Sequence, residues 1–169
     1  MFPSRSRLEG WNPDSLTFTG PGVRAGGEAV EQAVDRINNN LKVMPETKAW
    51  AGPAHDAATA MFDRAHQTTT RFSDCTSAIA NALNEGASVI GAARKALLDK
   101  ADEIDSGPLN VSEGWVVLID PGSQTQEQIT QLMNQVTTAQ AAINTLLVAV
   151  GDADASTADK VMAATKRQS

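Results

Sequence analysis

The chain has 169 residues, a formal net charge of −6 at pH 7, and only 4% aromatic residues. This length suits one domain with an aliphatic, alanine-rich core, and the scattered Lys and Arg residues argue against a nucleic-acid partner, which needs a basic stripe. The single cysteine excludes an internal disulfide, and because no apolar stretch follows the basic start Met1–Arg7, neither a secretory signal nor a membrane span is expected.

The first 22 residues predict an extended N-terminal arm, because Trp11 stands there among prolines and glycines. After it, apolar residues in steps of three and four predict a helix over residues 23–44. This apolar stripe consists of Val30, Val34, Ile37, Leu41 and Met44.

A turn is predicted over residues 45–53, because Pro45 ends the first helix and Pro53 suits the first turn of the next. The second helix should run over residues 54–105, since its apolar spacing continues almost without a break and no proline lies between Pro53 and Pro108. Its core stripe includes Met61, Phe72, Cys75, Val89 and a flanking row from Phe62 through Leu97 to Ile104. Many stripe residues are Ala, Thr or Gly, so the facing helices should approach closely.

Beyond residue 105 the pattern changes to that of a β-hairpin over residues 109–119, with Leu109–Val111 and Trp115–Ile119 on either side of a turn. A third helix is expected over residues 123–150, with Ser123 as its N-cap. Residues 151–169 read as a linker and the start of a fourth helix, because Gly151–Ala155 interrupts the spacing and Ser156 with Asp159 suits a capping box. The predicted fold class is mainly α, an elongated antiparallel helical bundle with a short β-hairpin between its second and third helices.

The sequence Trp50-Ala51-Gly52, between two heptad-patterned helices, resembles the WXG family of type VII secretion substrates. The resemblance covers roughly Val23 to Asp105. It implies a helical hairpin that pairs into a bundle and leaves the cell without a cleavable signal peptide. The length beyond the hairpin is similar to the amino-terminal secretion domains of larger actinobacterial effectors. The chain has no tyrosine, so the family's Tyr-x-x-x-Asp/Glu export signal is absent in its usual form.

Four residues at this turn are the expected partner-binding residues: Trp50, Gly52, His55 and Asp56. Gly52 gives the backbone freedom to turn, and Trp50 offers a large apolar surface that either fills a groove of a partner or only staples the loop. Asp56 is favourably placed near the positive end of the following helix. The expected partner is a secretion-system component, a chaperone or a WXG-like protein. The third helix favours a monomer, although a homodimer or heterodimer stays open.

The chain offers little for catalysis, metal or cofactor binding. His55 and His66 lie about sixteen ångströms apart along a helix, too far to share one ion, and Asp63 with His66 reads as a surface pair. Neither a phosphate-binding loop nor a Gly-x-Ser-x-Gly elbow is present, and Cys75 reads as a small buried thiol. No catalytic, metal or cofactor residue is therefore expected.

The first functional hypothesis is a non-enzymatic type VII export and protein-interaction module, cytoplasmic before export and then secreted or retained in the cell envelope. The alternative is the non-catalytic front part of a secreted toxin or enzyme whose active domain lies beyond residue 169. A plain coiled-coil protein that self-assembles is a third hypothesis.

Overall fold

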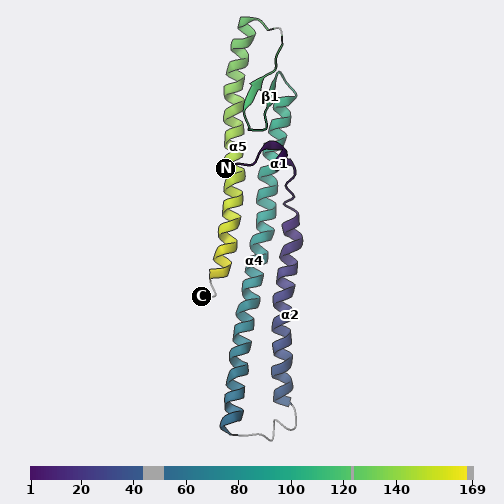
Figure 1. The fold of residues 1–169 in the computed structure, drawn as a ribbon, viewed down its shortest axis with the longest axis vertical. Helices are drawn as coiled ribbons and strands as arrows, with labels where there is room; N and C mark the ends of the chain where they lie inside the picture. Colours follow the sequence, from purple (N-terminus) through teal and green to yellow (C-terminus); the bar gives the residue numbers. More distant parts are fainter. Residues whose placement is uncertain (44–51, 123, 167–169) are drawn as a thin grey trace. The chain divides into compact units, whose positions relative to one another are not determined.

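The computed structural model describes residues 1–43, 52–122 and 124–166 (Figure 1). The chain is mainly helical, with one small antiparallel sheet, as the sequence predicts. Its elements are α1 (Arg5–Glu9), α2 (Ser15–Val43), α4 (Pro53–Asp105), β1 (Leu109–Val111), β2 (Val117–Ile119) and α5 (Gln126–Lys166).

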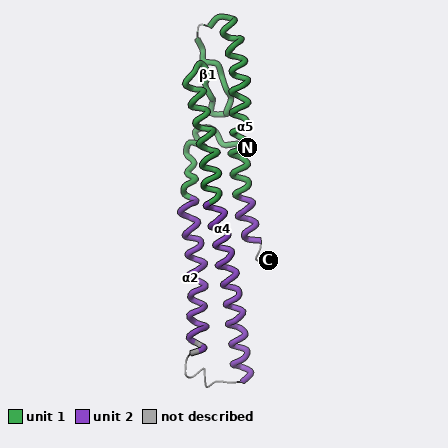
Figure 2. Tube along the Cα trace, turned by 180° about the vertical axis from the view of Figure 1, so that it is seen from behind, with its two compact units in different colours: residues 1–15, 85–157 green, residues 16–84, 158–169 purple. Residues whose placement is uncertain are grey.

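The chain divides into two compact units, coloured separately in Figure 2. Unit 1 comprises Met1–Ser15 and Glu85–Thr157, and unit 2 comprises the described parts of Leu16–Asn84 and Ala158–Ser169. Both α4 and α5 contribute to each unit, so the division does not follow the helix ends.

The prediction for the long helix is confirmed, since α4 begins at Pro53 and ends at Asp105. The prediction of an extended arm over residues 1–22 is wrong. Ser4 caps the short helix α1 by accepting a hydrogen bond from the Arg7 backbone N–H, and α2 already begins at Ser15. Pro21 lies inside α2, so a residue that usually ends a helix does not end this one.

The predicted break at Gly151–Ala155 is also wrong, because α5 continues to Lys166. A Cβ atom at Gly151 would lie 2.8 Å from the Phe2 ring, so this glycine provides room for an aromatic side chain rather than a helix end.

The capping box of α5 lies two residues after the predicted N-cap Ser123, which is outside the described residues. The Thr125 hydroxyl accepts from the Gln128 backbone N–H, and the Gln128 side chain accepts from the Thr125 N–H.

The core of unit 1 is built from α1, α4, the sheet and α5. Leu8, Leu97 and Ile143 are completely buried, and Leu109 and Val117 bring one side of the sheet into the same cluster. Burial of a large aliphatic side chain stabilises a fold by about 1.5–3 kcal/mol, so this cluster is the principal hydrophobic core of the described residues.

The turn of the β-hairpin differs from the prediction. Trp115 and Val116 belong to the turn rather than to the second strand, and the Trp115 backbone N–H donates to the Ser112 carbonyl at 3.0 Å. Trp115 has a φ of +65°, the left-handed region that is unfavourable for a residue with a side chain. Its indole is nevertheless 4% exposed and donates to the Pro3 carbonyl at 2.7 Å, so burial holds the turn in this conformation.

Side chains from neighbouring elements cover both edges of the two-stranded sheet. On β1, the Val111 N–H donates to the Asp105 carboxylate at 2.8 Å, and the Val111 carbonyl accepts from Arg5 at 2.9 Å. On β2, the Val117 N–H donates to the Gln140 side chain at 2.8 Å. Unpaired strand edges invite pairing with other chains, so these three side chains close the sheet against further strands.

Arg5 also fixes the N-terminal segment to the end of α4. The Arg5 side chain is 13% exposed, and its guanidinium lies 2.6 Å from the Asp105 carboxylate and 2.9 Å from the Asp102 carboxylate. Partial desolvation acts to raise the pKa of Asp105, but the Arg5 hydrogen bond, the Val111 N–H and the Arg5 charge together lower it. Two hydrogen bonds from Ser6 lower the pKa of Glu113 in the turn of the β-hairpin.

These lowered pKa values predict that acid releases the N-terminal segment, residues 1–15, from the rest of unit 1. A carboxyl group whose pKa is lower in the folded than in the unfolded protein stabilises the fold above its usual pKa, near 4, and this contribution is lost as the pH falls through the folded value. Amide exchange in α1, measured relative to the intrinsic rate at each pH, should therefore increase selectively below about pH 4. Arg5→Gln should raise that exchange already at neutral pH, whereas Asp99→Asn, which breaks an exposed pair with Lys95, should not. An N-terminal segment that stays equally protected at pH 3 and pH 7 would contradict this account.

In unit 2, helix α2 packs against α4 through glycine. A Cβ atom at Gly27 would lie 1.9 Å from the Thr76 hydroxyl oxygen, and one at Gly20 would lie 3.1 Å from the Ala80 carbonyl oxygen. The two glycines are seven residues apart, so they recur on the same side of α2 and allow its backbone to approach α4 closely.

Polar pairs continue this α2–α4 contact and run in opposite order along the two helices. Their contacts are Arg24 with Asn81 (2.6 Å), Glu31 with Thr70 (2.9 Å) and Asp35 with His66 (2.6 Å). As residue numbers rise on α2 they fall on α4, so the helices are antiparallel. The Arg24 Nε–H is buried and has no hydrogen-bond partner within the described residues, which costs about 1–3 kcal/mol.

Candidate interaction site

The start of α4 carries three of the four predicted site residues. Gly52 has a φ of +125°, and its carbonyl accepts the first hydrogen bond of the helix, from the Asp56 N–H at 3.0 Å. Pro53 follows as the first helical residue, where its missing N–H costs nothing. The predicted roles of Gly52 as a turning residue and of Pro53 as a first-turn residue are therefore confirmed.

His55 and Asp56 lie in the first turn of α4. The His55 side chain is partly exposed and the Asp56 side chain is largely exposed, and His55 Nδ1 lies 3.5 Å from Asp56 Oδ1. A carboxylate at this position complements the positive end of the helix. Both side chains are accessible at the site that the sequence indicates, whereas Trp50 lies outside the described residues.

His66, which the sequence pattern paired only with Asp63, makes a tertiary contact with α2. His66 Nδ1 lies 2.6 Å from Asp35 Oδ1 on α2, so this residue belongs to the α2–α4 contact. Among the residues that the structure describes, no three His, Cys, Asp or Glu side chains gather as a metal site would require. Cys75 is partly rather than fully buried and donates to the Ala164 carbonyl of α5 at 3.4 Å.

Unit 2 buries small and polar side chains but exposes large apolar ones. In its described part the buried hydrophobic residues are all alanines, namely Ala80, Ala82 and Ala164. The exposed fractions are 44% for Val30, 52% for Ile37, 52% for Met61 and 44% for Phe72. These four residues belong to the predicted core stripes, so the prediction that they form a core is wrong for this chain alone.

Periodicity did not reveal which side of α2 meets α4, because the contact uses residues that hydrophobicity scales do not mark as core. The available signal was the pair Gly20 and Gly27, seven residues apart and in register with Thr76 and Ala80 once the helices are antiparallel. Glycines seven residues apart lie on one side of a helix and allow another helix to approach closely on that side.

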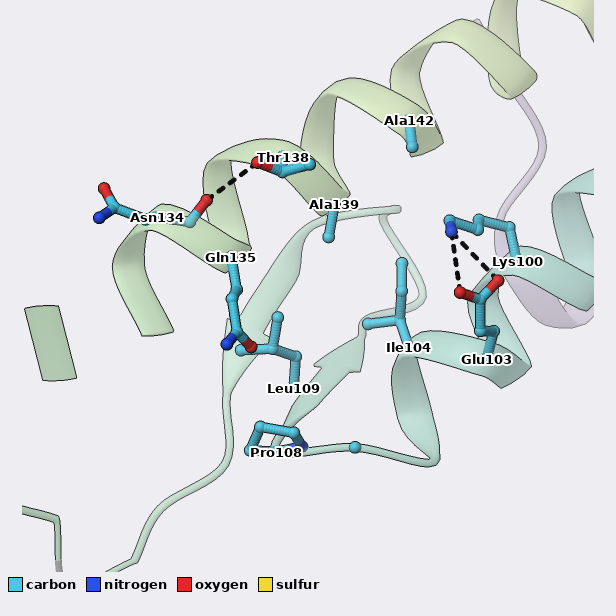
Figure 3. Close-up of a pocket in the computed structure, with 11 residues that line it drawn as sticks. Lys100, Glu103, Ile104, Pro108, Leu109, Asn134, Gln135, Thr138, Ala139 and Ala142 are labelled. Carbon is cyan, nitrogen blue, oxygen red and sulfur yellow. Dashed lines mark hydrogen bonds and ion pairs between the residues drawn. The ribbon is translucent and has the colours of Figure 1, made fainter. Parts of the chain in front are cut away.

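Unit 1 contains a groove of about 470 Å³ between the end of α4, β1 and α5 (Figure 3). Ile104, Leu109 and Ala139 line its apolar part, and the ion pair of Lys100 with Glu103 stands at one side.

None of the described helices contains an apolar stretch long enough to cross a lipid bilayer. Comparison of the chain with protein-family models, with curated proteins and with solved structures finds no match.

Proposed function

We propose that this chain is a non-enzymatic export and protein-interaction module of a type VII secretion pathway, recognised through the helical hairpin of α2 and α4 and its Trp-x-Gly turn. In this proposal the helices form an elongated antiparallel bundle. The folded chain passes from the cytoplasm to the cell envelope or the exterior, and it binds a secretion component, a chaperone or a WXG-like partner on the way.

The observation that carries the proposal is the antiparallel order of the α2–α4 contacts together with the left-handed Gly52 at the start of α4. The chain reverses direction between Val43 and Pro53, and the sequence Trp50-Ala51-Gly52 stands in that interval. In the sequence Trp50 stands two residues before Gly52, and His55 and Asp56 in the first turn of α4 are accessible, which supports recognition at this end of α4.

The test is Trp50→Ala, with export and stability measured on the same variant. If Trp50 contacts a partner, export should fall at least tenfold while the Tm falls by no more than about 3 °C, roughly 1 kcal/mol for a chain of this size. Trp115→Phe is the matched control, because it removes one hydrogen bond in unit 1 and should lower the stability at least as much as Trp50→Ala, by about 1–2 kcal/mol, without affecting export. A Trp50→Ala variant that loses export only in proportion to its stability would favour the loop-staple role instead.

A further inference from the structure

Unit 1 contains a second hollow, between the N-terminal segment and helix α5, that the proposed function does not use. Its volume is about 490 Å³, within the range of about 300–1,000 Å³ that is usual for the binding sites of small molecules. In Figure 1 the N-terminus lies beside α5, and both parts belong to unit 1. The lining residues that matter here are Phe2, Arg7 and Trp11 of the segment, with Val150, Gly151 and Asp154 of α5.

Two aromatic rings and a valine form the apolar part of the hollow. Val150 is 1% exposed, which places it at the floor, whereas Phe2 is 47% exposed and Trp11 is partly exposed. Gly151 follows Val150 on α5, and a Cβ atom there would lie 2.8 Å from the Phe2 ring. The glycine therefore lets Phe2 pack against α5. Accessible aromatic surface over a buried aliphatic floor is typical of a small-molecule site.

Contacts outside the hollow fix the segment that carries these rings. The Trp115 indole donates a hydrogen bond to the Pro3 carbonyl at 2.7 Å. The Arg94 guanidinium donates to the Leu8 and Glu9 carbonyls at 2.9 and 2.6 Å. These bonds hold the backbone at both ends of α1, so the hollow is formed before a ligand arrives, and less conformational entropy is lost on binding.

Two opposite charges line the hollow from different elements. Arg7 lies on α1 and Asp154 on α5, and both residues are exposed. Neither side chain forms a hydrogen bond or an ion pair with any residue that the structure describes. Arg5 of the same segment differs, because Asp102 and Asp105 bind its guanidinium. The hollow therefore presents one cationic and one anionic group that do not neutralise each other.

This combination of groups favours a zwitterion over a simple ion. A guanidinium binds a carboxylate through two parallel hydrogen bonds, and a carboxylate binds an ammonium group through a charge-assisted one. A simple anion would meet Arg7 but bring its charge near Asp154, and a simple cation would do the reverse. A free α-amino acid carries both charges at one end and its side chain at the other, which matches exposed charges around a buried apolar floor.

We propose that this hollow binds a free α-amino acid with a large apolar side chain. Arg7 binds the carboxylate of the ligand, Asp154 binds its ammonium group, and the ligand side chain lies over Val150 between the rings of Phe2 and Trp11. The site is independent of the export function, since none of the residues at the start of α4 contributes to it.

The test compares three small molecules with the full chain at neutral pH. L-Leucine carries both charges, isocaproate is the same molecule without the ammonium group, and isoamylamine is the same molecule without the carboxylate. Each is titrated into isotope-labelled protein, and the indole N–H signal of Trp11, assigned through its loss in Trp11→Phe, reports binding. L-Leucine should bind with a Kd at least tenfold lower than that of either analogue, because only L-leucine meets both charges.

Two substitutions identify which protein group binds each charge. Arg7→Gln should raise the Kd of L-leucine at least tenfold without weakening the binding of isoamylamine. Asp154→Asn should raise the Kd of L-leucine at least tenfold without weakening the binding of isocaproate. Asp152→Asn is the matched control, because this exposed carboxylate lies two residues away and does not line the hollow, so the Kd of L-leucine should stay within twofold.

Three results would overturn the proposal. The first is a Trp11 signal that does not shift at millimolar L-leucine, and the second is an equal Kd of L-leucine for Asp154→Asn and Asp152→Asn. The third is binding of isocaproate as tight as that of L-leucine, which would assign the hollow to anions with an apolar tail. All three leave the export function untouched, because that function is measured through Trp50.

Discussion

Replacing Gly27 by alanine should separate α2 from α4 and unfold much of unit 2. The added Cβ would lie 1.9 Å from the Thr76 hydroxyl oxygen and 2.9 Å from its Cβ, both far inside contact distance. Thr76 is itself buried, and its hydroxyl donates to the Ser73 carbonyl, so it cannot simply turn away. Overpacking of this kind costs about 1–3 kcal/mol, and unit 2 has few buried apolar contacts that could offset the loss.

The neighbouring glycine provides the control. A Cβ at Gly26 meets nothing within 4 Å, and alanine in a helix is more stable than glycine by about 0.5–1 kcal/mol, so Gly26→Ala should raise the stability slightly. Chemical denaturation followed by circular dichroism, with amide exchange on α2, would measure both variants. Thr76→Ala should partly rescue Gly27→Ala, because it removes the two atoms of Thr76 other than Cβ that the new methyl group meets. If the two glycine variants have equal stability, the close approach of the helices is not a source of stability.

The sequence predicts α4 and the strand β1 accurately because their signals are local and strong. A run of heptad-spaced residues without proline defines a helix from Pro53 to Asp105, and the change to alternating residues near Leu109 defines a strand. Glycine and proline were less informative. Gly151 was read as a break and Pro21 as part of an extended arm, yet both lie inside helices, and a Cβ atom at Gly151 would meet the Phe2 ring.

Of the candidate site at the start of α4, only the backbone conformation and the positions of the residues in the helix were predictable from the sequence. The positive φ of Gly52 and the place of Asp56 in the first turn of α4 follow from turn and helix-capping rules. The exposure of Val30 and Ile37 was not predictable, since a stripe of Val and Ile residues predicts burial without saying whether the same chain buries it. That distinction depends on the glycines that turn another side of α2 toward α4.

Replacing Trp115 by alanine should strongly destabilise unit 1. The indole is almost completely buried in the cluster formed by Leu8, Leu97 and Val117, and truncation of such a side chain costs about 3–5 kcal/mol. The loss should also free the N-terminal segment, because the indole N–H holds the Pro3 carbonyl. Thermal unfolding should show a fall in Tm of roughly 6–20 °C for a chain of this length.

Two further substitutions at this position separate packing, hydrogen bonding and backbone strain. Trp115→Phe keeps most of the buried ring but loses the bond to Pro3, so it should cost only about 1–2 kcal/mol. Trp115→Gly relieves the unfavourable φ of +65° and should be less damaging than alanine, by about 1 kcal/mol, although it leaves a larger cavity. If alanine proves as stable as glycine, the left-handed turn carries no strain. If phenylalanine proves as damaging as alanine, the contact with Pro3, rather than the burial of the ring, holds the N-terminal segment on the sheet.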